Sequence, residues 1–130
     1  MYSATTDFVT VSVEPAYMPK ESSPAESLYV WSYKVRIENN GAEPLQLKSR
    51  YWRIVDAYGR VQELRGAGVV GEEPVIAAGA AYEYTSGTPL PTPSGIMDGA
   101  YSMQREDGAM MDVTIPAFSL HTPGMSQNPN

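Results

Sequence analysis

Residues 28–40, LYVWSYKVRIENN, constrain the fold more than any other part of this sequence. Large apolar side chains occupy the odd positions from Tyr29 to Ile37, and polar or charged ones alternate with them from Ser32 onward. A period of two over this length predicts a β-strand with one buried face, because successive side chains of a strand point to opposite sides of the sheet. Asn39-Asn40-Gly41 then predicts a turn, since asparagine and glycine tolerate positive φ angles.

Six further strands are predicted from shorter runs of alternating or β-branched residues that are separated by turn residues. These runs are residues 7–14, 45–56, 60–65, 80–86, 100–105 and 110–115. Pro15 and Pro116 are expected to end the strands before them, because proline cannot donate a ladder hydrogen bond. The proline-rich stretches 15–27 and 88–95 are expected to be loops, and Glu106-Asp107-Gly108 predicts a tight hairpin.

The strand predicted at residues 45–56 changes phase along its length. Leu45 and Leu47 are odd-numbered, whereas Trp52 and Ile54 are even-numbered. One buried face cannot hold both pairs, so we expect either a β-bulge near residues 49–51 or a change of partner strand there.

Short strands at regular spacing predict an all-β fold, an immunoglobulin/fibronectin-III-like antiparallel β-sandwich of about seven strands, with a small barrel as the alternative. Residues 98–103 place Tyr101 at the spacing of a tyrosine corner, which favours the sandwich. We expect a single domain over residues 1–130, with an ordered core at about residues 5–118 and a flexible tail at residues 119–130.

The composition argues against several functional classes. The chain has no cysteine and a formal net charge of -6, which excludes thiolate chemistry and makes duplex nucleic acid and anionic membranes poor partners. His121 is the only histidine, so neither a Ser-His-Asp triad nor a histidine-rich metal site is expected. The N-terminal residues lack the features of a signal peptide, and we expect a cytoplasmic protein with no catalytic residue, metal or cofactor.

Residues 65–71, RGAGVVG, contain the pattern G-x-G-x-x-G. In nucleotide-binding folds this pattern precedes a helix whose N-terminus binds pyrophosphate. Glu72-Glu73-Pro74 follows here, and two acids and a proline disfavour both the phosphate and the helix. The glycines are therefore interpreted first as a connection between strands, with a phosphate-binding nest as the alternative. The ligand-binding residues of that alternative are Arg65, Gly66, Gly68 and Gly71.

Seven of the nine basic residues lie between residues 34 and 65. They are Lys34, Arg36, Lys48, Arg50, Arg53, Arg60 and Arg65. They can be ordinary solvent-facing positions on adjacent strands. Alternatively, they form a locally positive face that would suit an acidic partner or a nucleotide. If the basic residues form a positive face, the interaction surface consists of Arg50, Arg53 and Arg60, beside the segments 65–74 and 85–93.

Several segments, in order along the chain, resemble the ApaG family, also called CorD. They are SRYWRIVD at residues 49–56, ELRGAGVVGEEP at 63–74, YTSG at 84–87 and GIMDGAY at 95–101. The resemblance extends from about residue 5 to residue 120. Tyr51 occupies the position of a histidine in the family's usual motif, which removes an inner histidine that could serve a metal or acid–base role.

The resemblance implies an immunoglobulin- or fibronectin-III-like sandwich that acts as a protein-binding module. It also implies an association with cobalt resistance and magnesium efflux, and the family's glycine motif implies pyrophosphate binding. We therefore expect a non-enzymatic module that binds an unidentified protein partner. The alternative is a pyrophosphate- or nucleotide-binding sensor, or a phosphohydrolase, that uses Gly66–Gly71. Direct handling of cobalt or magnesium is a third hypothesis, weakened by the lack of ligands.

Overall fold

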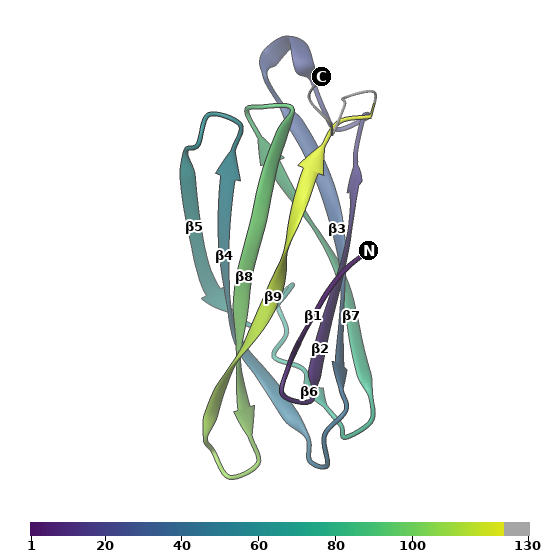
Figure 1. Cartoon of the computed structure of the whole chain (residues 1–130), viewed down its shortest axis with the longest axis vertical. Coiled ribbons are helices and arrows are strands. Elements are labelled where there is room, and N and C mark those ends of the chain that lie inside the picture. Colours follow the sequence, from purple (N-terminus) through teal and green to yellow (C-terminus); the bar gives the residue numbers. More distant parts are fainter. Residues whose placement is uncertain (124–130) are drawn as a thin grey trace.

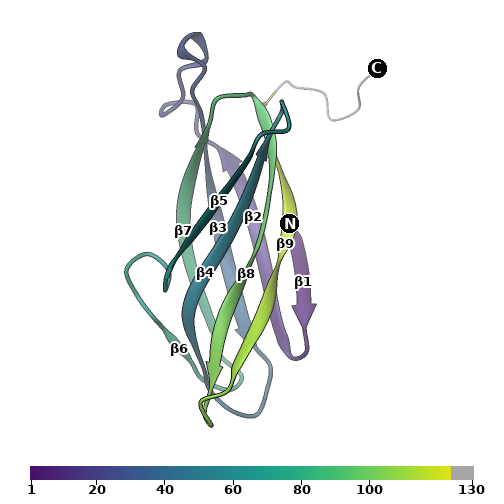
Figure 2. The same ribbon diagram turned by 90° about the vertical axis from the view of Figure 1, so that its left-hand side faces the viewer.

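The computed structural model describes residues 1–123, which form two antiparallel β-sheets packed face to face (Figure 1, Figure 2). The strands are β1 (Tyr2–Thr6), β2 (Val9–Tyr17), β3 (Tyr29–Asn39), β4 (Leu45–Asp56), β5 (Val61–Ala67), β6 (Val75–Ile76), β7 (Ala81–Leu90), β8 (Ser94–Arg105) and β9 (Met110–His121). The first sheet has the order β1-β2-β3-β7, and the second has the order β5-β4-β8-β9, with β6 paired to β4. The predicted all-β sandwich is confirmed, and the described residues add two short strands, β1 and β6, and a 3-10 turn at Pro24–Glu26.

The strand from which the fold was predicted is β3, and it is central in the first sheet. It pairs with β2 on one side and with β7 on the other. Its side chains at Trp31, Tyr33, Val35 and Ile37 are buried, whereas Lys34 and Arg36 on the other face are exposed. The alternation of apolar and polar residues therefore identified both the strand and its buried face.

The centre of the sandwich is an aromatic cluster to which both sheets contribute. Tyr33 comes from the first sheet, and its ring centroid lies 5.2 Å from that of Trp52 in the second. Phe118 packs against both, with ring centroids 6.0 Å from Tyr33 and 6.0 Å from Trp52. These tilted and edge-to-face contacts add to the free energy gained by removing three large rings from water.

A buried pair of tyrosine hydroxyl groups joins the two sheets beside this cluster. Tyr101 lies in the middle of β8, and its hydroxyl group hydrogen-bonds the hydroxyl group of Tyr84 on β7. The prediction of a tyrosine corner was wrong, because Tyr101 bridges the sheets instead of capping the start of a strand. Burial raises the pKa of the Tyr84 hydroxyl and the pKa of the Tyr101 hydroxyl above the ordinary value of tyrosine.

Stability is expected to fall when the pH rises above about 10, the pKa of tyrosine in an unfolded chain. Above this pH the unfolded chain releases the protons of Tyr84 and Tyr101 while the native state keeps them, so the free energy of unfolding decreases by about 1.4 kcal/mol per pH unit for each group. Urea unfolding between pH 8 and pH 11 measures the slope. The double variant Tyr84→Phe/Tyr101→Phe should have a shallower slope, and equal slopes for the two proteins would contradict this account.

Three strands continue through prolines that were expected to end or exclude them. β2 runs through Pro15 to Tyr17, β7 includes Pro89, and β9 runs through Pro116 to His121. Pro15 lies beyond the last β2 residue that pairs with β1, and β7 and β9 are each the last strand of their sheet. Proline is tolerated at such edges because one side of the strand needs no ladder hydrogen bonds. Pro116 also lies at a bulge, opposite the register shift between Met97 and Gly99.

The phase change in β4 has both of the causes that were considered. Its pairing with β8 shifts register between Leu47 and Ser49. On its other edge, β4 pairs with β6 at Leu45 and Gln46, and with β5 from Ser49 to Val55. A β-bulge and a change of partner therefore occur close to the predicted position, and together they place Trp52 and Ile54 in the core.

The ordered strands extend further than the predicted core of residues 5–118 at both ends. β1 begins at Tyr2, and the Thr6 hydroxyl group accepts a hydrogen bond from the Thr114 amide of β9 at 3.0 Å. At the other end, the Trp31 indole donates to the His121 carbonyl at 3.0 Å. The remainder of the predicted tail, residues 124–130, lies outside the described residues.

None of the helical segments described in residues 1–123 has the length and the apolar character of a transmembrane helix.

Candidate functional site

The glycine motif forms a tight β-turn and is not followed by a helix. Val69 and Glu72 exchange two backbone hydrogen bonds, at 2.8 and 2.9 Å. Val70 and Gly71 between them have φ angles of 43° and 81°, as in a type I′ turn. Val69 is buried and anchors this turn to the core, and the chain then continues to the short strand β6. The expectation that no helix follows the motif is confirmed.

The surroundings of positions 66 and 68 leave little room for a side chain, which favours glycine at both. Gly68 has a φ angle of 58°, and a Cβ atom there would lie 2.0 Å from the Glu72 carbonyl oxygen. A Cβ atom on Gly66 would lie 2.7 Å from the Arg50 guanidinium group. Gly68 and Gly71 are therefore explained by backbone geometry, and Gly66 by the close packing of the Arg50 side chain.

The charged groups around the turn are engaged with the protein itself. The Arg50 guanidinium group donates to the carbonyl oxygens of Ala67 and Gly68, both at 2.9 Å. Glu73 forms an ion pair with Lys48 at 2.7 Å, and Glu72 accepts a hydrogen bond from Tyr82 at 3.1 Å. A phosphate group at this turn would meet two carboxylates and no helix dipole. Pyrophosphate binding at Arg65–Gly71 remains a prediction that this geometry does not favour.

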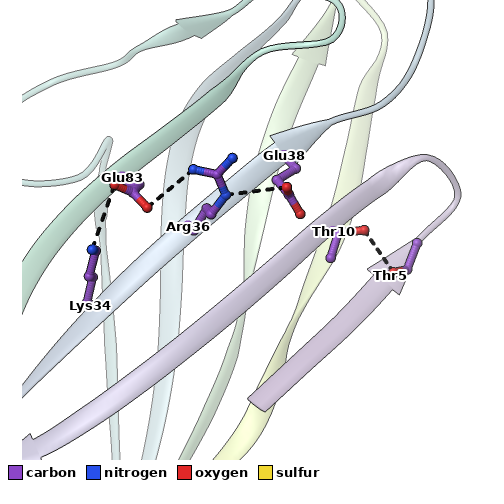
Figure 3. Close-up of polar contacts among 6 residues, drawn as sticks. All are labelled: Thr5, Thr10, Lys34, Arg36, Glu38 and Glu83. Carbon is purple, nitrogen blue, oxygen red and sulfur yellow. Dashed lines mark hydrogen bonds and ion pairs between the residues drawn. The ribbon is translucent and has the colours of Figure 1, made fainter. Parts of the chain in front are cut away.

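The basic residues do not form a uniformly positive face. Six of the seven between residues 34 and 65 lie within 4.0 Å of a carboxylate oxygen. Figure 3 shows two of them on the outer face of the first sheet, where Glu83 pairs with Lys34 at 3.9 Å and with Arg36 at 3.3 Å. Each such exposed pair contributes little to stability, but together the pairs cancel the local charge.

The structure separates the three arginines that were expected to share a surface. Arg50 lies beside the glycine turn, whereas Arg53 lies on the outer face of β4, 3.6 Å from Asp98. Arg60 lies in the β4–β5 turn, 2.8 Å from Asp56. Thr92, near the end of the segment 85–93, lies beside that β4–β5 turn, where its hydroxyl group accepts a hydrogen bond from the Ala57 amide at 3.1 Å.

Tyr51 lies on the outer face of the second sheet, although its position was expected to face inward. Its hydroxyl group donates to Glu63 at 2.8 Å, and the Arg65 guanidinium carbon lies 4.5 Å from its ring centroid. The hydrogen bond to Glu63 raises the pKa of the Tyr51 hydroxyl. The neighbouring residue, Trp52, is the one that points into the core.

A row of apolar side chains on this outer face was not found from the sequence. In register, Val61 of β5 lies opposite Val55 of β4, and Val55 lies opposite Ile96 of β8. Val61 is 52% exposed and Ile96 is 49% exposed, and Tyr58 in the adjacent turn is 79% exposed. The signal for Val55 was present, because it is out of phase with the buried Trp52 and Ile54. Ile96 was missed because its strand was predicted to begin at residue 100, whereas β8 begins at Ser94.

An open hollow of about 580 Å³ lies on the same face. Small side chains form part of its lining, with charged residues on two sides. The lining includes Ser49, Arg65, Ala100, Ser102 and Asp112. The apolar row, Tyr58 and this hollow all lie on the outer face of the second sheet. Among residues 1–123, no group of three or more His, Asp or Glu side chains could hold a metal ion.

Comparisons with known proteins agree with this fold over the whole chain. Residues 19–105 match the ApaG domain. The chain is 58% identical to Protein ApaG of Paramagnetospirillum magneticum over 123 residues, which is 95% of each chain. It is 55% identical to Protein ApaG of Rhodospirillum centenum over 130 residues, the full length of both.

Solved structures give the same result. The putative ApaA protein from Bordetella pertussis is 50% identical, with a TM-score of 0.87 over 90% of this chain and 95% of that one. A protein from Archaeoglobus fulgidus, 8% identical with a TM-score of 0.55 over 88% of this chain and 98% of that one, shares the fold alone. The match of the domain and the identity of the full-length relatives establish that this chain belongs to the ApaG family.

Proposed function

We propose that this protein is a non-enzymatic module that binds another protein through the outer face of its second sheet. The observation that carries the proposal is the row Val61–Val55–Ile96, which crosses three strands in register and is half exposed at both ends. Single exposed apolar residues are ordinary, but a contiguous row beside an exposed tyrosine is typical of contact surfaces.

The shape and charge of this face favour an extended peptide segment as the ligand. The row crosses three neighbouring strands, so the apolar side chains that alternate along an extended peptide can contact it. The hollow next to it has Arg65 on one side and Asp112 on another, and these groups can bond the carbonyl and amide groups of a peptide backbone. Ile96 is 49% exposed, so burying it fully would contribute about 1 kcal/mol, and burying the ring of Tyr58, which is 79% exposed, would contribute more.

The association with cobalt resistance and magnesium efflux that the family resemblance implies fits a binding role in which the partner moves the ion. Catalysis has less support, because the glycine turn is accounted for by backbone geometry and its carboxylates are paired. A phosphate-release screen with nucleotides and dinucleoside polyphosphates, with and without Mg²⁺, separates the two classes. Turnover that the variant Arg65→Ala abolishes would overturn the proposal in favour of a phosphohydrolase.

The variant Ile96→Lys is expected to lose partner binding by at least about tenfold, because a charge replaces half-buried apolar contact area. Thr85→Lys is the matched control, since Thr85 is exposed on the outer face of the first sheet. Proteins that the wild type captures from a cell extract are identified and purified as candidate partners. Titration calorimetry then measures the affinity of each candidate partner for the wild type, for Ile96→Lys and for Thr85→Lys. Equal affinity of the wild type and Ile96→Lys for every candidate would contradict this surface.

A further inference from the structure

We propose that β5 pairs in antiparallel orientation with β5 of a second copy, so that the second sheet is continuous across a symmetric dimer. Figure 1 shows β5 at the margin of the molecule, and β4 is the one described strand that pairs with it. Six of its seven residues are exposed, and it contains no proline. Charged side chains, prolines and bulges protect many edge strands from pairing. The two charged residues of β5, Glu63 and Arg65, are of opposite sign, so they can attract a strand with the complementary order of charges.

The backbone of β5 has hydrogen-bonding groups directed away from β4. The Gly68 amide donates to the Lys48 carbonyl at 2.9 Å, and the Asp56 amide donates to the Arg60 carbonyl at 3.1 Å. In an antiparallel ladder, every second residue directs its amide and carbonyl groups to the neighbouring strand. These two bonds show that the even-numbered residues of β5 direct theirs to β4. The amide and carbonyl groups of Val61, Glu63 and Arg65 are therefore directed to the open edge.

The order of charges along β5 selects one register for pairing with a second copy. When the two-fold axis passes through Leu64, Glu63 lies opposite Arg65 of the second copy, and Arg65 lies opposite its Glu63. A shift of two residues would place Glu63 opposite Glu63, or Arg65 opposite Arg65, and like charges directly opposite are destabilising. A shift of one residue would place outward-facing side chains opposite inward-facing ones. Among these registers, only the one centred on Leu64 places opposite charges against each other on both sides of the axis.

Leu64 gives this register an apolar centre. Its side chain is 46% exposed and shares a side of the sheet with the buried Trp52, its pairing partner in β4. On the axis, Leu64 faces Leu64 of the second copy in a pair without ladder hydrogen bonds, where side chains approach most closely. A self-complementary patch of this kind is what a two-fold interface requires, which favours a second copy over an unrelated protein.

Val61 and Arg65 of β5 also belong to the proposed contact face, but Ile96 and Tyr58 lie outside β5, so variants at Ile96 separate this inference from the proposed function. Sedimentation velocity of the full-length chain from about 1 to 200 µM measures the association directly, a range that detects micromolar dissociation constants. We expect the wild type to shift from monomer to dimer across this range, and Leu64→Lys to remain monomeric. Ile96→Lys is the control and should dimerise like the wild type. Circular dichroism establishes that each variant is folded.

A charge swap tests the register. Glu63→Arg and Arg65→Glu should each weaken the dimer by at least about tenfold, because each creates like-charged pairs across the axis. The double variant Glu63→Arg/Arg65→Glu restores opposite charges and should recover the wild-type dissociation constant to within a few-fold. A wild type that stays monomeric at the highest concentration would overturn the proposal. A dimer that survives Leu64→Lys, or a double variant no tighter than the single ones, would overturn it equally.

Discussion

Replacing Trp52 with alanine is expected to lower the free energy of unfolding by about 3–5 kcal/mol. Trp52 is 3% exposed and packs against the rings of Tyr33, Tyr101 and Phe118. Its removal leaves a cavity between the two sheets, and the rings around it belong to three different strands that cannot all move inward. Since the whole stability of a domain of this size is about 5–15 kcal/mol, the variant should lose a large fraction of its stability.

Urea unfolding of the wild type, Trp52→Ala and Tyr58→Ala provides the measurement. Tyr58→Ala is the matched control, because it also deletes an aromatic ring but at an exposed position, and its effect should lie within about 0.5 kcal/mol. The slope of the free energy against urea concentration should be the same in all three proteins if only stability has changed. A loss of less than about 1 kcal/mol in Trp52→Ala would contradict the central place of this cluster.

The buried face of each main strand could be predicted because it depends on local alternation. β3 shows this directly, and β4 shows that even a break in the alternation has a local signature, since Leu47 and Trp52 differ in phase. The exact cause of that break involved strands that are remote in sequence. The bulge arises in the pairing with β8, and the exchange of partners requires β6 and β5.

The prolines show what local reasoning lacks. Pro15, Pro89 and Pro116 were expected to end or exclude strands, but whether a proline is tolerated depends on which edge of the strand has a partner. That information is a property of the sheet order, to which segments far apart in the chain contribute. β1 and β6 were missed for a related reason, because their few residues carry little alternation of their own and are defined by their partners.

The candidate site was predicted less well than the fold. The glycine turn was located and its missing helix was expected, because both depend on adjacent residues. The apolar row was missed, because Val61, Val55 and Ile96 come together only through the register of three strands. Tyr51 was assigned to the wrong face for the same reason: the bulge before it decides which residues point inward.

Replacing Gly68 with alanine is the second change with a large expected effect, a loss of about 2–4 kcal/mol in the free energy of unfolding. The added Cβ atom would lie 2.0 Å from the Glu72 carbonyl oxygen, which itself accepts the Val69 amide within the turn. The turn must therefore open, and the Gly68 carbonyl would move away from the Arg50 guanidinium group. A left-handed φ angle adds a further penalty for any residue other than glycine.

Gly71→Ala is the matched control, because Gly71 also has a positive φ angle but a Cβ atom there would have no atom of a non-adjacent residue within 4 Å. It should cost only the backbone penalty of about 1–2 kcal/mol. Urea unfolding ranks the two variants, and amide hydrogen exchange at residues 67–72 locates the change. If Gly68→Ala cost no more than Gly71→Ala, the close approach of the Glu72 carbonyl would not be what requires glycine at position 68. The requirement for glycine at position 68 would then need another explanation.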